Sequence, residues 1–236
     1  MGAEAILHLI PVWLGEAGGP EQLAPMSLDT VARVRLFFVE HERSARRALR
    51  RMDPVFALGQ VTMHVLDKDT DEATVRRYAE LVHQAGEATL LSESGMPCVA
   101  DPGARLVAWA HRMNIEVRPH PGPSSLLLAL AGSGLDGQHF TFHGYLPREA
   151  EERRRALRTI AQDAQRTGRT QLFIETPYRN DALLADLLRT VDGALRLCIA
   201  AELMQPTGFI RTRTVSEWRS DAPVLKDRRT VFVLGR

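Results

Sequence analysis

The chain has 236 residues, of which 44% are hydrophobic and 25% charged, and its net charge is +1. This length fits one large or two small domains, and the composition is typical of a soluble globular protein. The low net charge excludes a global field that attracts nucleic acid, so any RNA site has to be a local basic patch. Two distant cysteines, Cys98 and Cys198, exclude a disulfide framework.

Targeting and membrane signals are the next class to be excluded. No apolar run approaches the roughly 20 residues that a membrane helix needs. The start, MGAEAILHLIPVW, lacks the basic region and the cleavage site of a signal peptide. We therefore expect a cytoplasmic protein with no membrane partner.

In the first half of the chain, short apolar runs alternate with amphipathic stretches. Strands are predicted at residues 6–10, 36–39, 88–91 and 115–118, and helices at residues 44–51, 72–84 and 104–113. Within the second helix, Val75, Tyr78, Ala79 and Val82 recur at the spacing of one helix face. This alternation predicts βαβ units and a mostly parallel sheet.

The pattern changes at PHPGP, residues 119–123, which cannot continue a strand or a helix. Ser124 is a plausible N-cap for a buried helix at residues 126–131. Further strands are predicted at residues 140–143, 171–175, 195–201, 210–214 and 230–234, with helices at 149–166 and 180–190. The fold class is therefore α/β, with a mostly parallel domain at 1–120 and a mixed-sheet domain at 121–236.

Several familiar site motifs are absent. The sequence has neither a P-loop nor a G-x-G-x-x-G after a strand, and it has no H-E-x-x-H, so we expect no metal site. GEAGGP at residues 15–20 is either a flexible loop or the wall of a cleft. Glu40, His41 and Glu42 follow the second strand, where they form either a ligand site or a solvated loop.

Three loops rich in glycine, proline and small residues follow predicted strands. They are SESGMPCVADPG at 92–103, PHPGPSS at 119–125 and IETPYR at 174–179. Ligands of open α/β sheets bind outside the carboxyl ends of the strands, and small residues there expose backbone groups to a ligand. The same loops also occur as plain connections, so both interpretations stay open at this point.

Taken together, these loops resemble one family. SESGMPCVADPG is similar to the S-D/E-A-G-x-P-x-x-x-D-P-G segment of the tetrapyrrole methylase-like, class III, S-adenosylmethionine (SAM)-dependent methyltransferases. PHPGPSS, FHGYLP at 142–147 and LFIETPYR at 172–179 resemble motifs of the branch that 2′-O-methylates cytidine in small-subunit ribosomal RNA. Weaker similarity continues through AAELMQPTGFIRT at 200–212.

The resemblance implies two α/β domains with SAM in the cleft between them, a homodimer, and ribosomal RNA or the small ribosomal subunit as partner. The implied SAM contacts of the first domain are Pro11, Ser94, Gly95, Met96, Pro97, Val99 and Ala100. Those of the second domain are Ser124, Ser125, Glu175 and Ala201. Glu93 is expected near the cofactor, and Asp101 is expected to cap the helix that begins near Ala104.

Two segments depart from the ribosomal branch. Its A-T-P-I-G-N-L is replaced here by LIPVWLGEAGG, and its C-E-D-T-R by VEHERSAR, which keeps Glu40. Both segments line the substrate side in that family, so the acceptor stays open. A small molecule such as a tetrapyrrole is one alternative acceptor, and a non-catalytic SAM-binding or interaction module is another possibility.

Methyl transfer from SAM needs alignment, exclusion of water and, for a ribose hydroxyl, a general base. The candidate bases are Glu40, Glu175 and Glu202, each of which could equally be a structural carboxylate. For substrate binding, Arg43, Arg46 and Arg47 are candidate phosphate anchors, and Tyr178 and Arg179 are candidate base contacts. Arg179 could instead cap a helix or pair with Glu175, and the arginines at 153–158 read better as a solvated helix.

Overall fold

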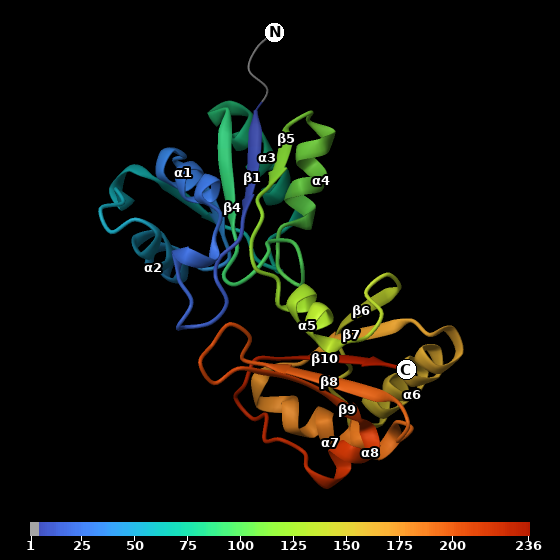
Figure 1. Ribbon diagram of the computed structural model, residues 1–236. Coiled ribbons are helices and arrows are strands. Elements are labelled where there is room, and N and C mark those ends of the chain that lie inside the picture. Colours follow the sequence, from blue (N-terminus) through green and yellow to red (C-terminus); the bar gives the residue numbers. More distant parts are fainter. Residues whose placement is uncertain (1–4) are drawn as a thin grey trace. The chain divides into compact units, whose positions relative to one another are not determined.

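The computed structural model describes residues 5–236. The chain divides into a first compact unit that ends at Ser124 and a second unit, Ser125–Arg236 (Figure 1). The predicted boundary between residues 120 and 121 lies four residues before this division. Each unit contains its own sheet and its own hydrophobic core.

The first unit contains a five-stranded sheet in which all strand pairs are parallel. Its strands are β1 (Ile6–Ile10), β2 (Leu36–Val39), β3 (Thr62–Val65), β4 (Glu87–Leu91) and β5 (Glu116–Pro119), in the order β3-β2-β4-β1-β5. The prediction of a mostly parallel sheet is therefore confirmed. It missed β3, because this edge strand is partly exposed and its sequence, TMHV, lacks a strong apolar run.

Helices cover both faces of this sheet (Figure 1). They are α1 (Pro25–Arg33), α2 (Glu42–Met52), α3 (Glu72–Ala85) and α4 (Ala104–Arg112), with short 3₁₀ helices at Pro20–Gln22 and Leu58–Gln60. One core cluster joins α3 and α4 to the sheet, and another joins α1 and α2 to its other face. Helix α1 was not predicted, because only three of its nine residues, Ser27, Thr30 and Val31, are buried.

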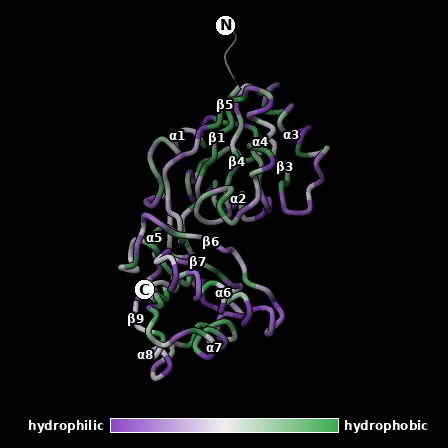
Figure 2. Tube along the Cα trace, turned by 90° about the vertical axis from the view of Figure 1, so that its right-hand side faces the viewer, coloured by the Kyte–Doolittle hydropathy of each residue, from purple (hydrophilic) through white to green (hydrophobic). Residues whose placement is uncertain are grey.

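The second unit contains a mixed five-stranded sheet, as predicted. Its strands are β6 (Phe140–Tyr145), β7 (Thr170–Ile174), β8 (Arg196–Ala201), β9 (Phe209–Thr214) and β10 (Thr230–Gly235), in the order β6-β7-β10-β8-β9. Only β6 and β7 pair in parallel; the other neighbours are antiparallel. The tube in Figure 2 shows hydrophobic residues along the central elements and hydrophilic ones along outer loops.

Helix α5 (Ser125–Ser133) packs on one face of the second sheet, and three helices pack on the other. These three are α6 (Ala150–Thr167), α7 (Asn180–Thr190) and α8 (Val215–Ser220), and a 3₁₀ turn at Pro177–Arg179 precedes α7. None of the helices described at residues 5–236 combines the length and apolar character that a membrane span requires.

The prediction that the arginines at 153–158 belong to a solvated helix is wrong in part. Arg153 is buried, and its Nε donates to Asp186 Oδ2 at 2.8 Å. Arg154 and Arg189 pair with the other oxygen of the same carboxylate, at 3.2 and 2.8 Å. The sequence did not indicate this network, because its acid lies on a different helix, α7.

Candidate functional site

Parallel pairing places the carboxyl ends of all five strands of the first unit at one edge of its sheet. The loop at 92–103 follows β4, and residues 120–124 follow β5. The segment after β1 begins at Pro11, and β1 lies between β4 and β5 in the sheet. Strand order therefore makes neighbours of three segments that are far apart in sequence.

The loop at 92–103 is tightly folded. Gly95, Cys98, Ala100 and Gly103 all have positive φ, between 58° and 130°. The Ser92 hydroxyl donates to Asp101 Oδ2 at 2.8 Å and accepts from the Ser94 amide at 3.1 Å, which ties the two ends of the loop together. Asp101 therefore closes the loop, and the prediction that it caps α4 is wrong: α4 begins after Gly103 without a side-chain cap.

Hydrogen bonds hold this loop against the segment that follows β1. Val12 and Gly95 exchange both backbone hydrogen bonds, at 2.7 and 3.1 Å. The Ser94 hydroxyl donates to the Trp13 carbonyl at 3.3 Å. The same two segments contain the predicted cofactor contacts Pro11, Ser94 and Gly95, so the structure brings these three together.

The loop after β5 packs closely against both segments. A Cβ on Gly122 would lie 2.7 Å from Pro11 Cβ, and a Cβ on Gly95 would lie 3.5 Å from the Pro123 carbonyl oxygen. Glycine is therefore needed at 122 for the chains to approach, and Ser124, a further predicted contact, ends this loop. Ser124 is buried.

The backbone groups of the 92–103 loop differ in what they can offer to a ligand. Gly95 uses its N–H and C=O on Val12. In contrast, the N–H groups of Met96, Val99 and Ala100 donate to no acceptor within residues 5–236. Val99 and Ala100 are exposed, so the second half of the loop presents free main-chain donors at the carboxyl edge of the sheet. Pro97 is buried.

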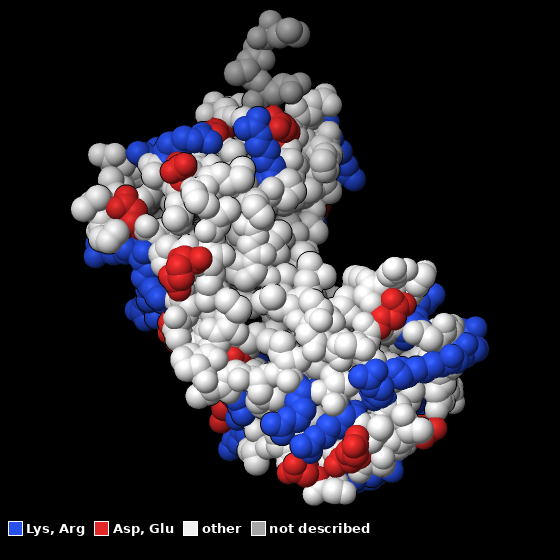
Figure 3. Space-filling model, viewed as in Figure 1, with Lys and Arg blue, Asp and Glu red and all other residues white. Residues whose placement is uncertain are grey.

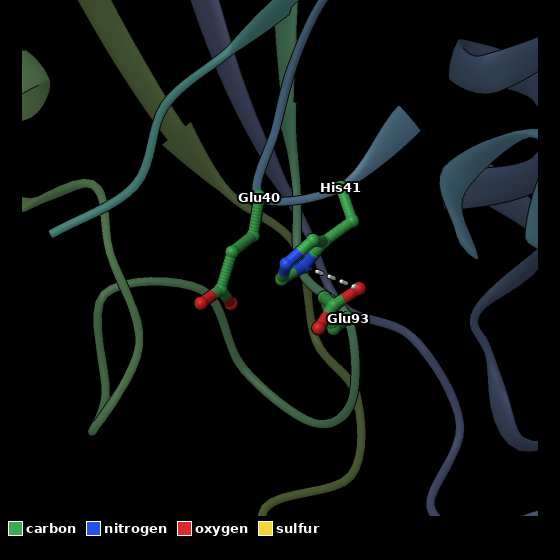
Figure 4. A group of neighbouring side chains, drawn as sticks. All are labelled: Glu40, His41 and Glu93. Atoms are coloured by element: carbon green, nitrogen blue, oxygen red, sulfur yellow. Dashed lines mark ion pairs between the residues drawn. The ribbon is translucent and has the colours of Figure 1, made fainter. Parts of the chain in front are cut away.

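Glu40, His41 and Glu93 form a cluster at the same edge (Figure 4). Their ligand atoms all lie within 4.8 Å of one another, and His41 Nδ1 lies 3.2 Å from Glu93 Oε1. Burial raises the pKa of Glu40, and the nearby Glu93 carboxylate raises it further. This spacing suits a bound cation. The sequence did not indicate it, since it combines residues from two different loops.

Acids and a thiol beside this cluster also have shifted pKa values. Burial raises the pKa of Asp101 to about 6, against the hydrogen bond from Ser92, and the charges of Glu40 and Glu93 act in the same direction as burial. Burial also raises the pKa of the Cys98 thiol to about 11, so Cys98 stays protonated at neutral pH. Three carboxylates, those of Glu40, Glu93 and Asp101, therefore lie at the carboxyl edge of the first sheet. The Asp101 carboxyl stays protonated up to a higher pH than an ordinary aspartate.

The second unit contains the remaining predicted contacts. Glu175 follows β7, and its fully buried side chain pairs with Arg179 and accepts from the Thr176 amide at 2.6 Å. Its other oxygen, Oε2, has no hydrogen-bond partner in the described part of the chain. Tyr178 is exposed beside Arg179. Of the alternatives for Arg179, the structure contains the pair with Glu175.

Ala201 and Ser125 lie at the ends of elements in this unit. Ala201 is the buried last residue of β8, opposite Thr230 of β10, and Ser125 begins α5. Glu202 follows Ala201 with a φ of 48° and accepts from the Arg229 amide at 2.6 Å. Strands β7 and β8 are separated by β10, so Glu175 and Glu202 lie about 10 Å apart across the sheet.

The predicted phosphate anchors Arg43, Arg46 and Arg47 are all exposed on α2, in the first unit. The N-terminal end of this helix touches the 92–103 loop, because the Ser44 hydroxyl donates to Glu93. The predicted site residues of the first unit therefore gather at one edge, whereas Glu175, Tyr178, Arg179, Ala201 and Glu202 belong to the second unit.

This arrangement matches a known family. Residues 17–216 match the family model of the tetrapyrrole (corrin/porphyrin) methylases. The chain belongs to this family. Its members transfer a methyl group from SAM, so the protein is a SAM-dependent methyltransferase.

Curated relatives of the family are similar over most of the chain. The ribosomal RNA small subunit methyltransferase I of Vibrio cholerae is 30% identical over 212 residues, which cover 90% of this chain and 69% of the relative. The protein of the same name from Xylella fastidiosa is 33% identical over 205 residues, covering 85% of this chain and 69% of the relative.

Solved structures of the family share the fold. The methyltransferase CobJ aligns with a TM-score of 0.63 and 19% identity, covering 98% of this chain and 92% of that one. The uroporphyrin-III C-methyltransferase of Thermus thermophilus, solved with S-adenosylhomocysteine, aligns with a TM-score of 0.55 and 18% identity, covering 98% and 97%. At these identities the likeness concerns the fold alone.

Proposed function

We propose that this methyltransferase methylates a ribose hydroxyl of small-subunit ribosomal RNA. The observation that carries the proposal is the similarity to relatives named ribosomal RNA small subunit methyltransferase I, at 30% to 33% identity and over 85% to 90% of this chain. The free N–H groups of Met96, Val99 and Ala100 support a site in which main-chain groups donate hydrogen bonds to SAM. We also propose that the protein acts in the cytoplasm.

The transfer is an in-line displacement at the methyl carbon of SAM, which breaks the carbon–sulfur bond and leaves S-adenosylhomocysteine. The protein has to align the acceptor oxygen with this carbon and keep water out. The acceptor hydroxyl loses its proton in the same step, and a carboxylate with a raised pKa is a suitable recipient.

Among the three candidate bases, the contacts favour Glu40. Glu175 accepts from Arg179 and Thr176, and Glu202 accepts from Arg229, so both carboxylates already hold loops in place. The Glu40 carboxylate accepts no hydrogen bond from any described residue, Glu40 is partly exposed, and its pKa is raised. We therefore propose that Glu40 is the general base that accepts the proton of the acceptor hydroxyl. Glu175 and Glu202 have structural roles.

The test uses small ribosomal subunits from a strain that lacks this gene. Wild-type protein with SAM is expected to add one 2′-O-methyl group, mapped by mass spectrometry of the RNA. Glu40→Gln is expected to bind SAM normally by calorimetry but to transfer the methyl group ~100- to 10,000-fold more slowly, since the base is removed.

Each outcome bears on a separate part of the proposal. An unmodified ribose map with active protein would reject the RNA acceptor, and turnover on a porphyrin would then favour a small molecule. Methyl transfer by Glu40→Gln at the wild-type rate, with Glu175→Gln inactive but folded, would move the base to the second unit.

A further inference from the structure

Helix α2 contains more positive charge than its own stability requires. Five of its 11 residues are arginine, and one is acidic. Three pairs of arginines are spaced i, i+4, so like charges meet along the helix and destabilise it. These pairs are Arg43 and Arg47, Arg46 and Arg50, and Arg47 and Arg51. The helix dipole favours only the cations of the last turn, which leaves the central ones unexplained.

Four of these arginines line one pocket of about 550 Å³. The lining residues are Arg46, Arg47, Arg50, Arg51, Leu58 and Gly59. The last two come from the 3₁₀ helix Leu58–Gln60, so an uncharged segment forms the other wall. Lys and Arg side chains gather in Figure 3 over the place that α2 occupies in Figure 1. We call this feature the α2 arginine pocket.

The chain itself neutralises little of this charge. Glu42 lies 3.5 Å from Arg46, but both side chains are nearly half exposed, and such pairs are weak. Arg51 donates to the carbonyl groups of Glu16 and Gly18 and stacks on Trp13, so it is oriented but keeps its charge. Within residues 5–236, Arg47 and Arg50 form no ion pair.

The arginines of α6 show the opposite situation. Arg153 and Arg154 share the carboxylate of Asp186 inside the second unit, where they hold α6 against α7. These two arginines are therefore neutralised by a carboxylate of the chain itself. The cations of the α2 arginine pocket face solvent without carboxylates of comparable number, which indicates an anionic partner from outside the chain.

We propose that the α2 arginine pocket binds backbone phosphates of the RNA acceptor; this rests on the RNA acceptor proposed above. Guanidinium groups pair with phosphate oxygens through two parallel hydrogen bonds, and such contacts fix the position of a strand without reading its sequence. Four exposed arginines that follow one another along α2 suit successive phosphates of a single strand better than one small anion.

The position of the pocket relative to the 92–103 loop fits this role. Ser44, near the start of α2, donates to Glu93 of the 92–103 loop. At a rise of about 1.5 Å per residue, Arg47 lies roughly 5 Å and Arg51 roughly 10 Å further along the helix axis. A strand held by these arginines therefore runs within a few nucleotides of Glu40 and the carboxyl edge of the sheet.

The test removes two charges that pair with no carboxylate in residues 5–236, in the double variant Arg47→Gln/Arg50→Gln. Its binding to a short single-stranded RNA is measured by fluorescence anisotropy over a range of salt concentrations. Affinity is expected to fall ~10-fold or more, because two charge-assisted contacts are lost. The slope of log affinity against log salt is expected to decrease by about 1.4, at about 0.7 per phosphate contact.

The matched control is Arg155→Gln/Arg158→Gln, which removes the same charge from exposed positions of α6. Its RNA affinity and salt slope are expected to match the wild type. Arg51 is left unchanged because it holds the loop around Trp13. Removing Arg47 and Arg50 also removes like-charge repulsion, so the midpoint of thermal unfolding should stay constant or rise, which excludes misfolding as the cause.

The outcomes separate this proposal from the proposed function. On small subunits, the double variant should raise KM for the RNA while kcat and the SAM affinity stay at wild-type values. If the double variant binds RNA with wild-type affinity and still methylates the subunit, the proposal that the pocket binds RNA is overturned, but the proposed function is not. Binding of tripolyphosphate, a small polyanion, is measured on the same variants. If the double variant loses tripolyphosphate binding but binds RNA as the wild type does, the pocket is a small-polyanion site and the proposal of RNA binding is overturned.

Discussion

At the scale of single residues, the 92–103 loop depends at Gly103 on a backbone conformation that only glycine adopts easily. Gly103 has a φ of 130°, and a Cβ there would clash with the side chain of Leu90 and lie 2.8 Å from Cys98 Sγ. Leu90 is buried in β4 and Cys98 lies in the same loop, so a Cβ at 103 displaces the loop. The Asp-Pro-Gly end of the motif is thus explained by packing, with Asp101 fixed by Ser92.

Gly103→Ala is therefore expected to lower the free energy of unfolding by about 1–3 kcal/mol, through backbone strain and overpacking. Urea denaturation measures this change, and calorimetry should show weaker SAM binding because the loop is displaced. Gly137→Ala is the control, since a Cβ at 137 meets no atom within 4 Å. Equal stability of the two variants would contradict the role of close packing at 103.

At the scale of elements, a chain of buried polar side chains joins α1 to the centre of the first sheet. Ser27 of α1 lies 3.2 Å from His120 Nδ1, and His120 Nε2 lies 2.9 Å from His8 Nδ1 on β1. His8 Nε2 lies 2.8 Å from Glu87 of β4. Burial lowers the pKa of both histidines, although Glu87 acts in the opposite direction on His8.

The two buried histidines, His8 and His120, make the stability of the first unit sensitive to acid. The pKa of each histidine is lower in the folded protein than its ordinary 6.5, so the unfolded chain binds more protons below that pH. The stabilisation is complete above pH 6.5 and is lost as the pH falls through the lowered values. Urea denaturation at a series of pH values should therefore show a decrease in stability below pH 6.5.

The variant that isolates this effect is His120→Gln, which should lose about 1–3 kcal/mol at neutral pH and show a flatter decline in acid. The control is His83→Gln, at an exposed position of α3 that has no ion pair in the described part of the chain, and it should keep the wild-type decline. An unaltered decline in His120→Gln would assign the acid sensitivity to other groups.

At the scale of the whole molecule, we propose that the protein is a homodimer. The resemblance to the family supports this, as do exposed apolar side chains on the second unit. Phe140 and Tyr145 lie on β6, an edge strand, and both are more than 40% exposed. Exposed apolar residues on an edge strand favour association with another chain.

Light scattering coupled to gel filtration should accordingly give a mass of twice 26.3 kDa. Dilution should shift the mass towards the monomer if the association is reversible, because dimer formation depends on concentration. A single species of 26.3 kDa at every concentration tested would contradict the homodimer.

Periodicity and local motifs were enough to predict most strands and helices, because each depends on neighbours in sequence. The predicted helix at 180–190 has the bounds that the structure gives α7, and residues 36–39 those of β2. Prediction failed where local signals were weak, as for β3 and α1, or where the partner was distant, as for Arg153 and Asp186.

The sequence by itself determined the fold class, the family motifs and the loops that follow the strands. Only the tertiary structure decided what those loops contact: Val12 pairs with Gly95, Asp101 closes its loop, and Glu40 meets Glu93. The reason is physical. Hydrophobic periodicity and turn chemistry act over a few residues, whereas burial, pKa values and charge clusters arise when strand order brings distant segments together.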